Sequence, residues 1–304
     1  ALMAVLVTPS AARPVRAAAY AVTGMGIIGV IDNVMPEVAA HIGLAQFHFV
    51  RSAMALCLLP LILVWTGLSL RPVNLLGVLG RSAFLTVGMA LYFACVGFLP
   101  VAQGLAGVFS APLLSMLATL LYGRRVDPVS ARFILCGFVG CLAVVQPNPA
   151  ALGWLAVGPL AAGFFYGMGG KVTRTWTAQE NVWTLTATYL TMIGVLGGLA
   201  LLILPPGGDD YITRGWAAMP WHVTLFCAVQ AVGALIAVGF LTRAYQLAAP
   251  AFVGAFEYTV LIVAAGIGYL AWGHGLNWLG AFGVVLILAS GAALAWWGDR
   301  GEVA

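Results

Sequence analysis

The chain has 304 residues, of which 62% are hydrophobic and 7% are charged, whereas ordinary soluble domains contain about 45–50% apolar and about 25% charged residues. This composition excludes a soluble globular domain and predicts an integral membrane protein. The formal net charge of +4 is no sign of nucleic-acid binding, because the basic residues of a membrane protein first report how the chain is oriented in the bilayer.

Ten apolar segments follow one another, separated by short polar, proline or glycine turns. They are expected at Val15–Ala39, Leu44–Thr66, Leu75–Leu99, Val101–Tyr122, Ser130–Gln146, Gly153–Lys171, Val182–Leu204, Ala218–Leu241, Ala249–Trp272 and Leu276–Trp297. The third begins at Leu75 or as late as Ser82. We therefore predict an all-α polytopic membrane protein with ten transmembrane helices. Residues 1–12 hold an apolar run too short to span a bilayer, and we expect a flexible cytosolic tail there, not a signal peptide.

Basic residues gather on one side of the predicted helices. If the N-terminus is cytosolic, the outer loops receive only Arg214, and Arg51 lies inside the second segment. The cytosolic side then receives Arg13, Arg16, Arg71, Arg81, Arg124, Arg125, Arg132, Lys171, Arg174, Arg243 and Arg300. This positive-inside bias predicts that both termini face the cytosol.

An internal repeat relates the two halves of the chain. A shift of 147 residues lays the fourth segment on the ninth and pairs Phe109 with Phe256. Because each half contains five helices, an odd number, the second half enters the membrane from the opposite side. Such inverted repeats place the substrate of a transporter near the membrane midplane. We predict two five-helix repeats, residues 13–150 and 151–304, that together form one transport domain around a central cavity.

The ninth segment carries one ionisable side chain, Glu257, about eight residues from its start, which is ~12 Å along a helix. Intramembrane acids are costly and usually face a bundle interior or a water-filled cavity. Glu257 either binds a substrate amine or exchanges a proton, or else it is protonated or hydrogen-bonded to a neighbouring helix. Both interpretations stay open.

A second polar group lies toward the outer ends of the first two segments. Asp32 and Glu37 end the first segment, while His48 and Arg51 lie three residues apart on one face of the second. An ion pair between Arg51 and Asp32 is one interpretation, because an intramembrane arginine rarely stays unpaired. In the other, Arg51 or His48 binds a substrate carboxylate on its way out.

Aromatic and amide side chains at mid-depth suit a cavity for a partly apolar, zwitterionic molecule, although each alone also serves ordinary packing. At most two of residues 164–166 face such a cavity, because three consecutive side chains cannot all point one way on a helix. The candidates are the aromatic residues Tyr92, Phe164, Tyr166, Tyr189 and Tyr258 and the amides Gln103 and Gln230.

Several short motifs carry a family resemblance. In the second half, Ala249-Pro250 leads into Phe256-Glu257-Tyr258, and the tenth segment runs from Gly280 through Ala289-Ser290-Gly291; in the first half, Gly107 leads through Ala111-Pro112-Leu113 to Gly140. Over nearly its whole length the chain resembles the EamA-type branch of the drug/metabolite transporter superfamily, and within it the YddG-type bacterial exporters of aromatic amino acids. Many of those proteins carry Gly-Glu after the fourth and ninth helices, where this chain has Gly123-Arg124 and Gly273-His274, so no role of those glutamates transfers.

The resemblance implies a basket of ten helices around a central cavity, alternating access, and export of neutral amino acids, aromatic ones included, across the bacterial inner membrane. We expect a monomer. Export of lipophilic cations coupled to protons is the main alternative, because an aromatic cavity with one acid also suits cation–π contacts. An organophosphate or nucleotide-sugar exchanger is disfavoured, since it needs cations for phosphate and only Arg51 is expected at membrane depth.

A membrane enzyme is also disfavoured. Its active site would need clustered titratable side chains or a nucleophile with its base in reach. The four histidines, His41, His48, His222 and His274, are scattered at or near the outer ends, without an HExxH or GxSxG motif. We therefore expect no catalytic residue, no cofactor and no metal site.

Overall fold

Helices make up the regular structure throughout the described part of the chain. The computed structural model describes residues 12–66, 70–96, 126–146, 157–206, 208–272 and 277–299, together with residues 108, 109, 111, 113, 114 and 120. Its elements are α1 (Ala12–Ile31), the 3-10 turn η1 (Asp32–Val34), α2 (Met35–His41), α3 (Leu44–Thr66), α4 (Leu75–Val96), α7 (Pro128–Val145), α8 (Val157–Thr175), α9 (Val182–Ile203), α10 (Trp221–Leu247), α11 (Pro250–Glu257), α12 (Thr259–Trp272) and α13 (Trp278–Asp299).

Membrane-spanning length and composition are found in six helical stretches, Pro14–His41, Leu44–Val64, Leu75–Cys95, Val182–Ile203, Trp221–Leu247 and Pro250–Ile267. Two shorter apolar helices cover Pro128–Val144 and Trp278–Leu294. Large apolar side chains also point outward, and those of Val64 and Leu270 are 85% and 83% exposed, as lipid-facing residues require. The regular structure in the described residues is therefore all helical, and the chain is a multi-pass membrane protein.

Most helix boundaries agree with the prediction. The third helix, α4, begins at Leu75, the earlier of its two predicted starts. The largest difference among the described helices is α10, which continues to Leu247 beyond the predicted Leu241, because its polar last turns are buried against other helices. The predicted fourth helix, Val101–Tyr122, lies mainly outside the described residues.

The first predicted helix is interrupted, contrary to expectation, by the turn η1 between α1 and α2. The side-chain amide of Asn33 donates to the carbonyl oxygen of Gly29 over 2.6 Å, and such local bonds compete with the helical ladder. Pro36, at the start of α2, has no backbone N–H to donate. The interruption places Asp32 at the end of α1.

The ninth predicted helix is likewise divided. Its first part, α11, ends at Glu257, and α12 begins at Thr259. The Thr259 hydroxyl donates to the carbonyl oxygen of Phe256 over 2.7 Å, again a side-chain bond that replaces part of the ladder. Interrupted helices are tolerated at membrane depth where they are buried or line a cavity. Each of the two interruptions carries an acidic residue.

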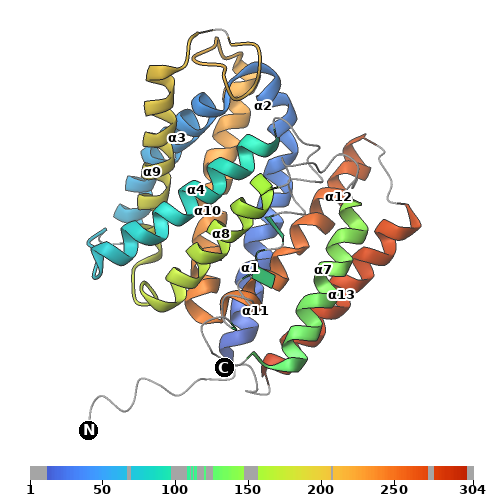
Figure 1. Ribbon diagram of the computed structural model, residues 1–304. Coiled ribbons are helices and arrows are strands. Elements are labelled where there is room, and N and C mark those ends of the chain that lie inside the picture. Colours follow the sequence, from blue (N-terminus) through green and yellow to red (C-terminus); the bar gives the residue numbers. More distant parts are fainter. Residues whose placement is uncertain are drawn as a thin grey trace.

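The helices pack mainly in four pairs, α4 with α8, α7 with α13, α1 with α10, and α3 with α9. In Figure 1, α1 runs between a group made by α3, α4, α8, α9 and α10 and a second group made by α7, α12 and α13. Glycines bring α7 and α13 close together: a Cβ atom on Gly140 would lie 2.8 Å from the carbonyl oxygen of Gly283. The start of α1 and the end of α10 lie at one end of the bundle, and α2 lies at the other.

Candidate functional site

A central cavity of about 130 Å³ lies between α1, α3, α4, α8, α9, α10, α11 and α12. Apolar side chains form much of its wall, among them Met25, Leu85, Met89, Val238 and Leu241. The polar side chains fall into two groups at different depths. One group lies at the end of α1, in the first turns of α3 and in the middle of α10, and the other lies in the first turns of α4, the last turns of α8 and α10 and the end of α11. A ligand in this cavity would meet an apolar middle and two polar ends.

Glu257 is held at the second of these ends by two tyrosines. Its carboxylate accepts hydrogen bonds from the hydroxyls of Tyr166, over 2.7 Å, and Tyr245, over 3.0 Å. The side chain is 2% exposed and lines the cavity. Within the described residues no basic group pairs with it. Glu257 is thus hydrogen-bonded to neighbouring helices and faces the cavity with neutral donors only, and its role in substrate binding stays a prediction.

Asp32 and Gln230 belong to the first polar end. The Gln230 amide donates to the carboxylate of Asp32 over 3.1 Å and to the carbonyl oxygen of Ile31 over 2.8 Å. Asp32 and Gln230 both line the cavity. Because one amide serves both acceptors, α10 holds the interruption that follows α1 in place.

Arg51 lies near this end without the ion pair that the sequence suggested. Among the described residues no carboxylate lies within 4.0 Å of it, because the Asp32 carboxylate is held by α10. The guanidinium lies over the rings of Phe47 and Phe93, 5.0 and 5.6 Å from their centroids, and its Nη2 is 3.4 Å from His48 Nδ1. Arg51 is 4% exposed, and its Nε atom has no hydrogen-bond partner in that part of the chain.

Arg81 is a cavity residue that the sequence analysis assigned to the cytosolic side. It is 2% exposed in the second turn of α4 and lines the cavity. Its guanidinium donates to the Thr173 hydroxyl over 3.2 Å, the Leu185 carbonyl over 2.8 Å and the Thr242 hydroxyl over 2.6 Å. These bonds join α4 to α8, α9 and α10. Because the third helix was predicted to begin at Leu75, the position of Arg81 inside that helix could have indicated that its side chain lies at membrane depth.

The remaining predicted site residues are placed differently from one another. Tyr92 and Tyr189 line the cavity. Phe164 does not, because it lies two residues from Tyr166 on another face of α8 and is 46% exposed. Tyr258 is fully buried beside the cavity and donates to the carbonyl oxygen of Phe109 over 3.2 Å. Gln103 lies outside the described residues.

Curated relatives of the chain are membrane transport proteins. A riboflavin transporter of Rhizobium johnstonii is 31% identical over 67% of this chain, which spans 65% of that protein, slightly less than two thirds. A pseudopaline exporter, CntI, of Pseudomonas aeruginosa is 23% identical over 88% of this chain and 91% of its own length. A riboflavin transporter of Vibrio cholerae is 24% identical over 91% of this chain and 92% of its length.

The fold is shared with a crystallised protein, which superposes with a TM-score of 0.77 at 13% identity over 96% of this chain and 99% of the other. No protein-family model matches the chain. The three names above agree with the expectation that the chain is not an enzyme, and none of them concerns aromatic amino acids, so the resemblance to YddG-type exporters stays a prediction. Together these similarities support a membrane transporter family for this chain.

Proposed function

We propose that the chain is a secondary transporter that exports neutral amino acids, aromatic ones included, across the bacterial inner membrane by alternating access. The observation that carries this proposal is the cavity, in which the Arg51 guanidinium and the Glu257 carboxylate each face the ligand space without an ion-pair partner among the described residues. A zwitterion offers the complementary charges. Because the two side chains lie at different depths, Arg51 would bind its carboxylate and Glu257 its ammonium group at successive positions in the cavity, with aromatic and methionine side chains against the rest.

The proposed architecture is a ten-helix inverted repeat with both termini in the cytosol. Each helix of the first half can be exchanged with its counterpart in the second half: α1 with α8, α3 with α9, α4 with α10, and α7 with α13. This exchange turns the α1–α10 pair into the α8–α4 pair and leaves the α3–α9 and α7–α13 pairs unchanged. All four main helix pairs obey this exchange, which supports two equivalent halves. Lys171, Arg174 and Arg243 belong to the last turns of α8 and α10, at the same end as the start of α1, in agreement with the positive-inside rule.

Riboflavin is a second candidate substrate, because two relatives, at 31% and 24% identity, are named riboflavin transporters. Aromatic and methionine side chains such as Tyr92, Phe93 and Met89 line the cavity and suit a planar ring system. An organophosphate is less strongly disfavoured than the sequence alone indicated, since Arg81 is a second base at membrane depth. However, Arg81 already makes three hydrogen bonds within the protein.

Uptake into proteoliposomes tests these alternatives directly. The labelled compounds are phenylalanine, threonine, methionine, riboflavin and the cation ethidium, each with and without a pH gradient. Movement of the amino acids supports the proposal, and their competition with one another would place them in one site. If only riboflavin or only ethidium enters the liposomes, that compound would replace neutral amino acids as the proposed substrate. A transport rate that depends on the pH gradient would show that substrate movement is coupled to proton movement.

Glu257→Gln is expected to lower phenylalanine transport about tenfold or more while the protein stays folded. An amide oxygen still accepts from the two tyrosine hydroxyls, but it carries no charge for an ammonium group, and a hydrogen bond to a charged group contributes about 1.5–3 kcal/mol. Initial transport rates at equal protein, beside thermal unfolding in detergent, measure the effect. Tyr258→Phe is the control, because Tyr258 follows Glu257 in the chain but does not line the cavity, and its unfolding is measured in the same way. Unchanged transport would remove Glu257 from the mechanism.

A further inference from the structure

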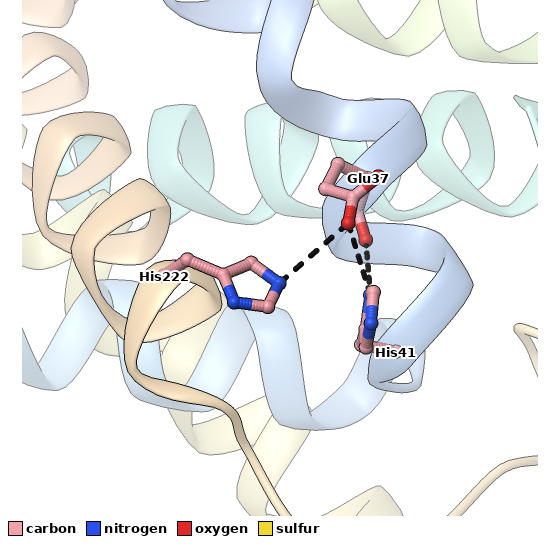
Figure 2. A group of neighbouring side chains, drawn as sticks. All are labelled: Glu37, His41 and His222. Carbon is pink, nitrogen blue, oxygen red and sulfur yellow. Dashed lines mark hydrogen bonds and ion pairs between the residues drawn. The ribbon is translucent and has the colours of Figure 1, made fainter.

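Three metal-ligating side chains meet at the outer end of the bundle, away from the cavity, where α2 packs beside the start of α10 (Figure 2). Glu37 and His41 are four residues apart on α2 and therefore share a face of the helix. His222 is the second residue of α10. The sequence analysis treated these histidines as scattered, and the fold brings two of them to one carboxylate.

The distances between the three groups fit a single metal ion. Glu37 Oε1 lies 3.6 Å from His41 Nδ1 and 3.6 Å from His222 Nε2, and one ligand atom from each residue lies within 4.8 Å of the others. Two ligands of a tetrahedral zinc ion, at bond lengths of about 2.0–2.1 Å, are ~3.3 Å apart. The two distances to Glu37 would have to shorten by a few tenths of an ångström, and the distance between the histidine ligand atoms, which is at most 4.8 Å, by up to about 1.5 Å, through rotation of exposed side chains.

The ligand chemistry also favours a zinc-like ion over a simple surface ion pair. Two imidazoles and one carboxylate are the protein ligands of open zinc sites, in which water fills the fourth position. An exposed His–Glu pair by itself contributes little to stability. His41 Nδ1 lies 2.9 Å from the Glu37 carbonyl oxygen, which can only accept a hydrogen bond, so a metal ion on Nδ1 would displace the proton of that bond. In the described part of the chain, this is the one place where three such ligands gather.

We propose that Glu37, His41 and His222 bind one Zn²⁺ ion, or a similar divalent transition metal, and thereby tie α2 to α10. The same two helices hold the cavity acid below the site. Asp32 begins η1, the turn that leads into α2, and Gln230, its hydrogen-bond donor, lies eight residues after His222 on α10, about 12 Å along the helix. A bound ion would add a second connection between α10 and the segment made by η1 and α2, beside the hydrogen bond between Gln230 and Asp32. The proposal does not depend on which molecule the chain transports.

Metal titration of the purified protein tests the site. After removal of any affinity tag and treatment with a chelator, the full chain in detergent is titrated with ZnCl₂ in a calorimeter, and the expected result is one ion per chain. CoCl₂ serves as a second probe, because its absorption distinguishes nitrogen and oxygen ligands from thiolates. Binding is expected to weaken on acidification, since protons compete with the metal for imidazole.

Three variants connect the binding to these side chains. His41→Ala and His222→Ala are each expected to weaken zinc binding at least tenfold and to abolish the rise in Tm that a ligand of the folded state causes. Asp209→Asn, which removes an exposed acid from the loop before α10, is expected to change neither quantity. Glu37→Gln repeats the test should a histidine variant fail to fold.

Two results would overturn the proposal. One is the absence of stoichiometric binding by the wild-type protein. The other is one-to-one binding that survives both His222→Ala and Glu37→Gln, or a thiolate absorption band with CoCl₂, because either would place the ion on other residues such as the free cysteines. Neither result bears on the transport assays, so the two proposals stand or fall separately.

Discussion

Arg51→Met is expected to lower the transport of amino acids about a hundredfold while the protein stays folded. The Arg51 guanidinium is 4% exposed, faces the cavity and has no carboxylate within 4.0 Å among the described residues. An arginine that binds a substrate carboxylate makes two parallel charge-assisted hydrogen bonds, each contributing about 1.5–3 kcal/mol. Their loss is therefore expected to raise the KM strongly, which initial rates over a range of phenylalanine concentrations measure.

The fold is expected to tolerate this change because the neighbours of Arg51 are mainly aromatic. A methionine of similar length packs on Phe47 and Phe93, and the substitution removes the cost of burying a charge that has no ion-pair partner among the described residues. Arg51→Lys serves as the comparison, since it keeps the charge without the planar fork, and it is expected to retain an intermediate rate. Transport by Arg51→Met within twofold of the wild type would exclude Arg51 from the substrate site. If the protein also transports ethidium, the ethidium transport rate is expected to be the same in Arg51→Met and in the wild type, because ethidium has no carboxylate.

Arg81→Met is expected to destabilise the protein by about 2–5 kcal/mol. Arg81 differs from Arg51 in that it donates to Thr173, Leu185 and Thr242, on three different helices. Its removal takes a charged donor away from these three acceptors, and a hydrogen bond to a charged group contributes about 1.5–3 kcal/mol. Thermal unfolding followed by tryptophan fluorescence in detergent measures the difference.

The same substitution at Arg51 is the matched control, because both arginines are buried and lose the same atoms. A much larger fall in Tm for Arg81→Met than for Arg51→Met would agree with a structural role for Arg81. Thr242→Val, which removes one acceptor only, is expected to cost about 1 kcal/mol. Wild-type stability of Arg81→Met together with lost transport would instead assign Arg81 to the substrate.

The helices could be predicted from the sequence because a bilayer-spanning helix needs only a sufficient run of apolar residues. The two interruptions could not, since they depend on single side chains. Asn33 and Thr259 compete for backbone carbonyls, and the same residue types elsewhere stay within regular helices, as Thr188 does in α9. Periodicity therefore predicted the presence of the first and ninth helices and missed their breaks.

The site was predicted in part for a related reason. Glu257 was recognisable because an acid in an apolar segment is rare, whereas Arg81 was assigned to the cytosolic side because the positive-inside rule counts bases near helix ends on one side. Its actual depth depends on acceptors from three other helices, which no local pattern contains. His41 and His222 lie far apart in the chain, and only the packing of α2 beside α10 brings them together.

The glycine contact between α7 and α13 has a consequence for motion. A Cβ atom on Gly283 would lie 2.6 Å from the carbonyl oxygen of Gly140, so no layer of side chains separates the two backbones there. Without such a layer, little can repack to let one helix slide past the other. If the chain works by the alternating access proposed above, we expect α7 and α13 to move as one rigid pair, relative to which the helices around α1 and α3 rotate.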